Sequence, residues 1–306
     1  MNSDFAARLG DYLKIKRYPL VNAVLVCKNN EIVFENYFNG FNPNSRGQIK
    51  SVWKSILSAT LGVCIDKKII DGVDETIGTY LPQFAAGGHP FHKHITIRHL
   101  LTMSSGIYWS GGAHYGCPMF ARMFESGDWV SYIADINVTH YPGPFFQYKE
   151  WDVILLSALI ERAAGRPAYE ICEEFIYAPL EINGERWTNL NGIDYPSPGE
   201  DNSSDLSARD MAKIGSLYLS GGTWGSRRII PEDFVRQSIT PSESSDGYGF
   251  LWRLSGNGFG ARGFGGQELN VYPELKTVAV LQATVTPRGK SYPDICEKLI
   301  LEKDFK

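Results

Sequence analysis

The sequence has 306 residues, of which 43% are hydrophobic and 21% are charged. This balance is ordinary for a globular protein, and the length allows one large domain or two in close contact. The net charge is -4 and the Lys and Arg residues are scattered rather than gathered in runs, so we expect no nucleic-acid partner.

The N-terminal segment and the cysteines predict the compartment. Residues 1–19 carry acidic and basic side chains throughout, unlike a signal peptide, and no apolar stretch is long enough to span a bilayer. We therefore expect a cytoplasmic protein with no membrane partner. The five cysteines form no tight motif and are interpreted as buried free thiols of a reducing compartment. They are Cys27, Cys64, Cys117, Cys172 and Cys296.

The N-terminal part alternates helix and strand. Phe5, Leu9 and Leu13 lie four residues apart and predict one stripe of a helix. Two β-rich segments follow at 21–27 and 31–38, separated by Lys-Asn-Asn, and they predict a hairpin. We expect a second helix after Ser51, where a long apolar run begins.

From about residue 68 to 245, helical patterns alternate with loops rich in Gly, Pro and Asn. Three helices are expected, within 95–106, 152–165 and 207–222. The pattern then returns to β-rich segments at 248–254, 267–274 and 276–285. A closing helix follows, with Ile295 and Leu299 on one face.

These elements predict an α+β fold with one antiparallel sheet, built from N- and C-terminal strands and flanked by the terminal helices. Residues 1–67 and 246–306 would form this α/β sheet domain, and 68–245 a large inserted, mostly helical domain. We expect the active site in the cleft between the two parts, where small-molecule sites commonly lie.

Ser51 and Lys54 form the only S-x-x-K motif in the sequence. Positions i and i+3 project from the same face of a helix, so the hydroxyl and the amine can meet. A serine hydroxyl needs a neighbouring base to become a nucleophile. The N–H groups at a helix N-terminus also favour developing negative charge. The pair is therefore a candidate nucleophile and base, although the motif alone is weak.

The base role sets a condition on Lys54. A free lysine has a pKa of about 10.4, so a base that works near pH 7 needs a shift of about 3 units, or roughly 4 kcal/mol. A helix dipole supplies only about 0.3–1 kcal/mol at exposed sites, so burial must do most of this. The apolar neighbours Val52, Trp53 and Ile56 favour such burial.

Four ordered segments carry a resemblance that extends from about residue 20 to 285. They are 51–84, 95–107, 141–166 and 261–280. In this order they resemble the serine β-lactamase and penicillin-binding-protein superfamily. The most similar branch is the class C-type group, with its family VIII esterases, D-aminopeptidases and 6-aminohexanoate-oligomer hydrolases.

The resemblance implies roles for three motifs. Ser51 and Lys54 match the nucleophile and its base, and Tyr148 matches a tyrosine that passes protons to the leaving group. The third motif of the family, Lys-Thr-Gly or His-x-Gly on a strand, is replaced here by Ala261-Arg262-Gly263. The backbone N–H groups of Ser51 and Phe264 would then hold the oxyanion.

Two positions depart from the family pattern. Glu150 stands where the second motif has Asn or Ser, and Ala261 where the third has Lys or His, which argues against classical β-lactam recognition. A carboxylate beside a lysine raises the lysine pKa by about 1–3 units and favours the inert ammonium. Either Glu150 points away from Lys54, or another cation neutralises it, or the site is impaired.

The opposite charges of Glu150 and Arg262, at matched places in their motifs, suggest that the two face each other across the cleft. We expect substrate contacts from the residues of these motifs and from one aromatic residue. They are Glu150, Ala261, Arg262, Gly263 and Trp109.

Other patterns are weaker. Residues 258–263 match G-x-G-x-x-G, but a strand rather than a helix is expected to follow, which argues against dinucleotide binding. His89, His92 and His94 lie in what reads as a surface loop without a Cys or acidic partner, so we predict no metal. G-x-S-x-G is absent, which argues against an α/β-hydrolase. Three aromatic residues either line the cleft or simply pack: Tyr108, Trp109 and Tyr115.

We therefore predict a serine hydrolase that cleaves an ester or amide of a small molecule through an acyl-enzyme on Ser51, without metal or organic cofactor. One alternative is a D-amino-acid peptidase or a β-lactamase-like amidase. An alternative of another class is a non-catalytic penicillin-binding or ligand-sensing protein, which the departures at Glu150 and Ala261 leave open. The intact Ser51, Lys54 and Tyr148 weigh against it. The substrate, its stereochemistry and the oligomeric state do not follow from the sequence.

Overall fold

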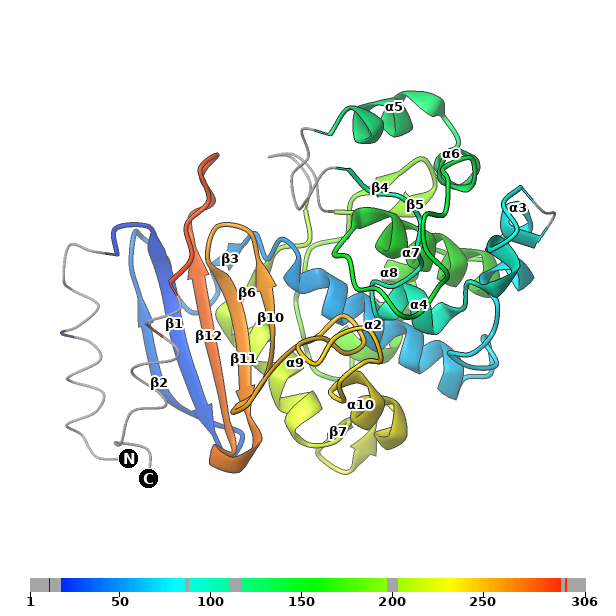
Figure 1. Ribbon diagram of the computed structural model, residues 1–306. Coiled ribbons are helices and arrows are strands. Elements are labelled where there is room, and N and C mark those ends of the chain that lie inside the picture. The colour runs from blue at the N-terminus through cyan, green and yellow to red at the C-terminus, as the bar shows by residue number, and fades with distance from the viewer. Residues whose placement is uncertain are drawn as a thin grey trace.

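The computed structural model describes residues 11, 18–85, 88–110, 117–196, 203–292 and 295. Within them, strands from the two ends of the chain form one six-stranded sheet in the order β2-β1-β12-β11-β10-β9 (Figure 1). Every pairing in this sheet is antiparallel. The strands are β1 (Val21–Lys28), β2 (Glu31–Tyr37), β9 (Arg253–Ser255), β10 (Gly258–Gly263), β11 (Gln267–Tyr272) and β12 (Thr277–Ala283). The predicted α+β fold with an antiparallel sheet is confirmed.

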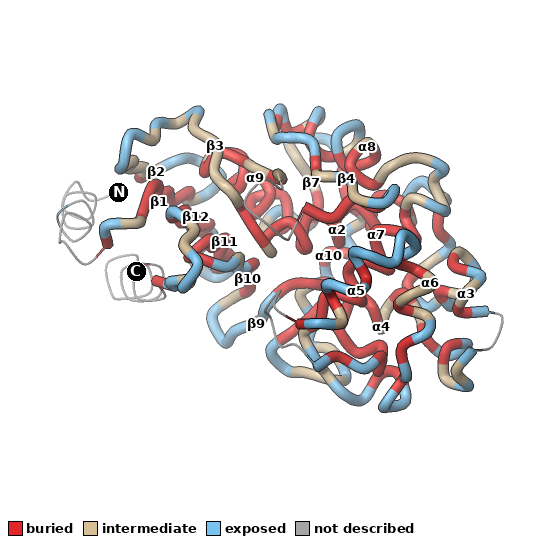
Figure 2. Tube along the Cα trace, turned by 90° about the horizontal axis from the view of Figure 1, so that it is seen from above, coloured by how far each residue is buried: buried red, intermediate tan, exposed pale blue. Residues whose placement is uncertain are grey.

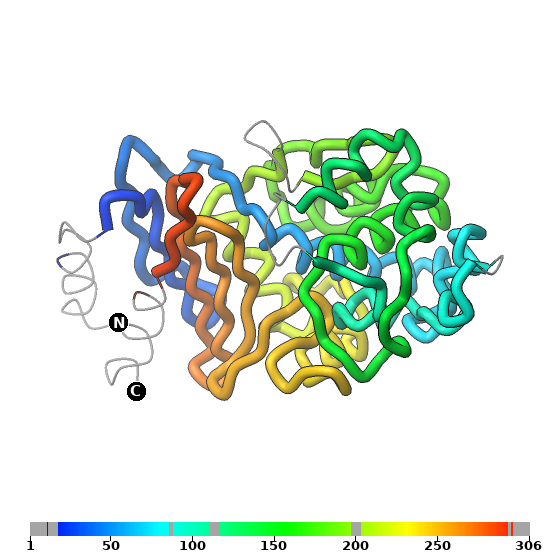
Figure 3. The backbone as a smooth tube through the Cα atoms, turned by 45° about the horizontal axis from the view of Figure 1, so that its top comes forward, coloured from blue at the N-terminus to red at the C-terminus, as the bar shows by residue number. Residues whose placement is uncertain are grey.

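The predicted hairpin is present, and strands from the N- and C-terminal parts of the chain pair with each other as predicted. Asn29 and Asn30 have φ of 50° and 64°, and positive φ at both central residues is what a two-residue type I′ hairpin turn requires. β12 then pairs with the other edge of β1, with Leu25 opposite Val280. Figure 3 shows these N- and C-terminal strands side by side.

Helices and short connections make up most of the remaining described chain. The helices are α2 (Val52–Asp66), α3 (Pro82–Ala85), α4 (Ile97–Leu101), α5 (Pro118–Ser126), α6 (Trp129–Ala134), α7 (Glu150–Ala164), α8 (Ala168–Cys172), α9 (Ala208–Leu219) and α10 (Glu232–Ser238). Short strands pair as β3 (Arg46–Gly47) with β6 (Leu206–Ser207), β4 (Asn189–Leu190) with β5 (Ile193–Asp194) and β7 (Thr223–Trp224) with β8 (Arg227–Arg228). The three helices predicted from the middle of the chain correspond to α4, α7 and α9.

One face of the sheet packs against helices α2 and α9 (Figures 1 and 2). Leu25, Leu269 and Val280 lie on this inner face and belong to the main hydrophobic core. The helix α9 falls within 68–245, which the sequence assigned to the helical insert, yet it packs on the sheet. Gly215 lets it approach closely, because a Cβ there would lie 2.6 Å from Val278 Cγ1. Apolar periodicity identifies a helix, but not the surface that it covers.

The outer face of the sheet has a second, smaller core. Val24, Val26 and Leu281 lie on this face and pack in a cluster that also contains Tyr292 and Ile295. We expected two terminal helices to flank the sheet, but most of their residues lie outside the described part of the chain. These include Phe5, Leu9, Leu13 and Leu299, and Cys296 also lies outside it. The other four cysteines are free and buried.

The helix α2 connects the sheet to the helical part. Its residues are buried from Val52 to Cys64, and it packs against α7, α8 and α10 as well as β10 and β11. It therefore contacts both the sheet and helices from the middle of the chain. Among the residues that the structure describes, no helix combines the length and apolar character needed to cross a membrane.

Candidate active site

The Ser51 hydroxyl and the Lys54 amine meet at the first turn of α2. Ser51 occupies the N-cap position and is partly exposed, whereas Lys54 is buried. Lys54 Nζ donates a hydrogen bond of 2.9 Å to Ser51 Oγ. The structure thus brings the two S-x-x-K side chains together as helical spacing predicts, with the hydroxyl facing outward and the amine inward.

Lys50, immediately before Ser51, has a left-handed backbone with φ of 48°. This conformation costs a non-glycine residue roughly 1–2 kcal/mol. Such strain persists only where the surroundings hold it, and it clusters at functional sites. Here Lys50 is itself buried, and the turn places Ser51 at the start of a buried helix.

Tyr148 reaches the same place from the loop that precedes α7. Lys54 Nζ lies 5.5 Å from the centroid of its ring, and Arg253 Cζ lies 5.6 Å from it. The ring of Tyr248 packs edge-on at 6.5 Å. Arg253 and Tyr248 were not among the predicted site residues, because they belong to none of the motifs. Burial raises the pKa of the Tyr248 phenol well above its usual range, so this group stays neutral beside Tyr148.

Glu150 is the first residue of α7 and lies against Lys54. Its Oε2 is 3.1 Å from Lys54 Nζ, and the side chains of Lys54 and Glu150 are 1% and 5% exposed. The same Oε2 accepts a 2.6 Å hydrogen bond from the hydroxyl of Tyr195, a buried residue just after β5. The possibility that Glu150 points away from Lys54 is therefore wrong. Tyr195 was missed because nothing in its local sequence distinguishes it from a core aromatic residue.

The third motif lies on β10, and its residues alternate between the two faces of the sheet. Ala261 is buried on the inner face, opposite Leu269. Gly263 lies on that face against the residues before α2, since a Cβ there would be 2.3 Å from the Ile49 carbonyl oxygen. The end of β10 therefore lies against Ile49 and Lys50, which immediately precede Ser51.

Arg262 projects from the opposite face of the sheet, where its register partner is Glu268. The carboxylate of Glu150 is instead held by Lys54 and Tyr195. This register argues against the hypothesis that Glu150 and Arg262 face each other across the cleft. Side chains alternate between the two faces of a strand, so Arg262, the neighbour of the inward-facing Ala261, points outward.

A buried polar network fixes the segment that carries Tyr148 and Glu150. Lys149, between them, donates 2.9 Å to the carbonyl of Ile107, and Ser105 Oγ donates 2.5 Å to Asp152. Burial lowers the pKa of Lys149 and raises that of Asp152 from 3.8 to about 6. These contacts tie the start of α7 to the loop after α4.

Trp109 belongs to the core rather than to an exposed wall of the site. Its ring packs edge-on against Trp151 at 4.8 Å and against Phe120 at 6.0 Å, and only 4% of its surface is exposed. This burial favours the packing interpretation of Trp109 over a substrate contact. Tyr108 next to it is 43% exposed, and Tyr115 lies outside the described residues.

The glycine-rich segment that matches G-x-G-x-x-G lies in the sheet. Residues 258–263 form β10, and a turn at 264–266 connects it to β11, so their glycines do not open a helix. Within the described ranges, no group of three or more His, Cys, Asp or Glu is suited to a metal ion.

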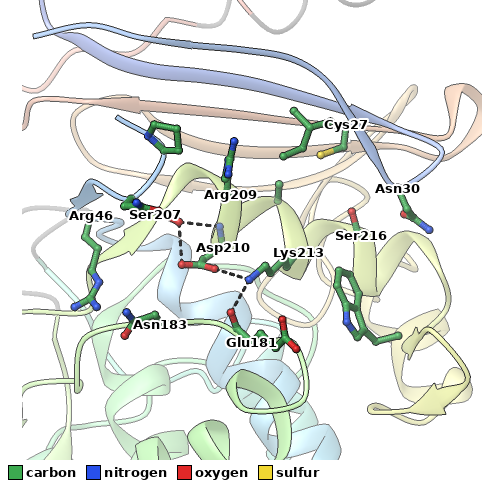
Figure 4. Close-up of a pocket in the computed structure, with 15 residues that line it drawn as sticks. Cys27, Asn30, Arg46, Glu181, Asn183, Ser207, Arg209, Asp210, Lys213 and Ser216 are labelled. Carbon is green, nitrogen blue, oxygen red and sulfur yellow. Dashed lines mark hydrogen bonds and ion pairs between the residues drawn. The ribbon is translucent and has the colours of Figure 1, made fainter. Parts of the chain in front are cut away.

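A separate cavity of about 490 Å³ lies beside α9 (Figure 4). Arg46, Arg209 and Lys213 are among its lining residues, but Ser51, Lys54 and Tyr148 are not. Its charges are largely paired: Lys213 bonds to Asp210, and Arg209 bonds to Glu35. It is therefore distinct from the cluster around Ser51.

Comparisons with known proteins relate most of this chain to one family. The family model described as β-lactamase matches residues 20–295. The 6-aminohexanoate-dimer hydrolase of Paenarthrobacter ureafaciens is 22% identical, over 90% of this chain and 75% of its own length.

Two solved structures share the fold. One from Bacteroides dorei, described as a candidate β-lactamase, is 17% identical with a TM-score of 0.78 over 97% of both chains. The D-stereospecific amidohydrolase of Streptomyces is 16% identical with a TM-score of 0.75, over 99% of this chain and all of its own. The match of the family model to nearly the whole sequence, on a fold these structures share, shows that the chain belongs to the β-lactamase family.

Proposed function

We propose that the protein is a serine hydrolase that cleaves a small-molecule amide, and secondarily an ester, through an acyl-enzyme on Ser51. The observation that carries this proposal is the 2.9 Å contact between Ser51 Oγ and Lys54 Nζ. A partly exposed hydroxyl with a buried amine behind it is the arrangement that an activated serine nucleophile needs.

Each step of the reaction has a candidate group. Ser51 Oγ attacks the carbonyl carbon while Lys54 Nζ takes its proton. The N–H groups of Ser51 and Phe264 hold the oxyanion, one at the start of α2 and the other at the end of β10. Tyr148 gives a proton to the leaving group and recovers one from Lys54. Water then attacks the acyl-enzyme and releases Ser51.

Relatives support the amide as the first substrate class to test. The 6-aminohexanoate-dimer hydrolase and the D-stereospecific amidohydrolase are named for amide substrates. A hydrolase that forms an acyl-enzyme also accepts activated esters when the acyl group fits, so esters are the second class.

The experiment compares wild type with Ser51→Ala on three substrates: the 6-aminohexanoate linear dimer, D-alanine p-nitroanilide and p-nitrophenyl acetate. We expect hydrolysis of at least one by wild type, and a loss of 10³-fold or more in the variant. A fluorophosphonate probe should increase the mass of wild type by that of one bound label and should leave the mass of Ser51→Ala unchanged.

A second candidate is a non-catalytic ligand-binding protein, favoured by the ion pair between Lys54 and Glu150, because a paired ammonium cannot act as a base. Its signature is a folded wild type that hydrolyses none of the three substrates and takes up no fluorophosphonate. That result would overturn the hydrolase proposal.

A further inference from the structure

Lys54 meets a chemical obstacle in the proposed hydrolase. With all its protons, its Nζ can only donate to Ser51 Oγ, which is how the two groups are bonded here. To accept the serine proton, Lys54 must first lose one of its own. A base for that proton has to lie within hydrogen-bond distance of Nζ, and the Glu150 carboxylate does so at 3.1 Å.

The surroundings of this pair favour the transfer. Both side chains are almost completely buried, and the ring of Tyr195, which bonds to Glu150, packs against Trp53 at 6.0 Å and against Trp129 at 6.1 Å. Removing a carboxylate and an ammonium from water is costly, whereas a neutral carboxylic acid and a neutral amine carry a much smaller penalty. Burial therefore brings the neutral pair closer in free energy to the ion pair.

We propose that Glu150 holds the proton that Lys54 gives up, and so keeps Lys54 in the amine form that activates Ser51. This role rests on the proposed hydrolase function. Glu150 acts through Lys54 and does not touch the substrate, so it is a positioning residue for the proton rather than a catalytic one.

The protons balance over one turnover. First an N–H bond of Lys54 breaks and an O–H bond forms on Glu150 Oε2. The Ser51 O–H proton then passes to Lys54 Nζ as Oγ bonds to the carbonyl carbon. Tyr148 protonates the leaving group and takes that proton back from Lys54. Water repeats the cycle through Lys54, and the Glu150 proton returns to Lys54 at the end.

Other titratable groups face the pair and must be considered in any pH experiment. Tyr248 interacts electrostatically with both Lys54 and Glu150. The other titratable groups on these segments are Tyr148, Lys149 and Asp152, which lie close to Glu150 in the sequence, Tyr195, which bonds to it, and Arg253, which lies over the Tyr148 ring. Tyr195 donates a hydrogen bond to the Glu150 carboxylate.

The test is the pH dependence of kcat/KM for wild type, Glu150→Gln and Glu150→Asp, with the substrate that wild type hydrolyses fastest. In Glu150→Gln, Lys54 must lose its proton to solvent to reach the amine form. We therefore expect the acid limb of the kcat/KM profile to move to higher pH by about 2 pH units. Activity at pH 7 then falls about 100-fold and recovers above pH 9, since one pH unit below a limb is tenfold in rate. Glu150→Asp keeps a carboxyl group and should keep the wild-type limb.

Two results would overturn the proposal while leaving the hydrolase in place. A Glu150→Gln profile parallel to wild type at every pH means that Glu150 only shapes the site. Higher activity than wild type at pH 7 means that Glu150 is an inhibitory counter-ion.

If Glu150→Gln does not fold, Tyr195→Phe replaces it. Loss of the Tyr195 hydroxyl, which donates to Glu150, makes the carboxylate more basic, so the acid limb of the kcat/KM profile should move to higher pH. An unmoved limb there counts against the proposal. Failure of the function itself differs, because wild type then shows no Ser51-dependent turnover.

Discussion

Substitution of Gly263 by alanine tests whether the end of β10 and the turn at residues 49–51 form one structural unit. The added Cβ would lie 2.3 Å from the Ile49 carbonyl oxygen and 3.1 Å from Lys50 Cβ, so the strand must move by about 1 Å. Overpacking of this kind costs about 1–3 kcal/mol. A displacement of about 1 Å at reacting groups costs about 10²-fold in rate. We therefore expect kcat/KM to fall about 100-fold and the Tm to fall by several °C.

The matched control is Gly256→Ala, in the turn between β9 and β10. A Cβ at Gly256 meets nothing within 4 Å, so this variant should keep wild-type Tm and kcat/KM. Both quantities are measured by thermal unfolding and by initial rates on the best substrate. If Gly263→Ala matches the control in both, the end of β10 does not depend on close approach to Ile49, and the oxyanion role given to Phe264 loses its structural basis.

Three further perturbations separate the roles of individual residues. Tyr148→Phe should lower kcat on a p-nitroanilide by about 10²–10⁴-fold but lower it less on a p-nitrophenyl ester, whose leaving group needs no proton; equal losses would exclude leaving-group protonation. Asp152 has a folded-state pKa of about 6 against 3.8 ordinarily, so its contribution to stability is complete below about pH 4 and is lost as the pH rises through 6. The Tm advantage of wild type over Asp152→Asn should therefore shrink between pH 4 and 6.5, by the equivalent of about 2–3 kcal/mol; a constant or growing difference would contradict this. Trp109→Ala should lose about 3–5 kcal/mol of stability, while Trp109→Phe keeps the wild-type KM; a raised KM at unchanged Tm would restore a substrate contact.

Local patterns in the sequence determined a large part of the molecule. The spacing of Ser51 and Lys54 on a helix places both side chains on one face, whatever surrounds them, and the structure has them 2.9 Å apart. The Asn29-Asn30 turn likewise encodes its own backbone conformation, because both residues tolerate positive φ. Strand and helix periodicity gave the α+β class and the antiparallel sheet for similar reasons: these signals act over a few residues.

The sequence did not predict which side chains contact the charged and aromatic residues, because those contacts join segments that are far apart in the chain. Glu150 meets Tyr195, 45 residues further along, and no local pattern connects the two. Arg262 was assigned to the site from its motif, but its strand register turns it to the other face of the sheet. Trp109 packs in the core, and α9 covers the sheet rather than joining the helical part. The sequence alone determined which groups could carry the chemistry. Only the tertiary structure decided which of them meet, because burial and register are set by segments far apart in the chain.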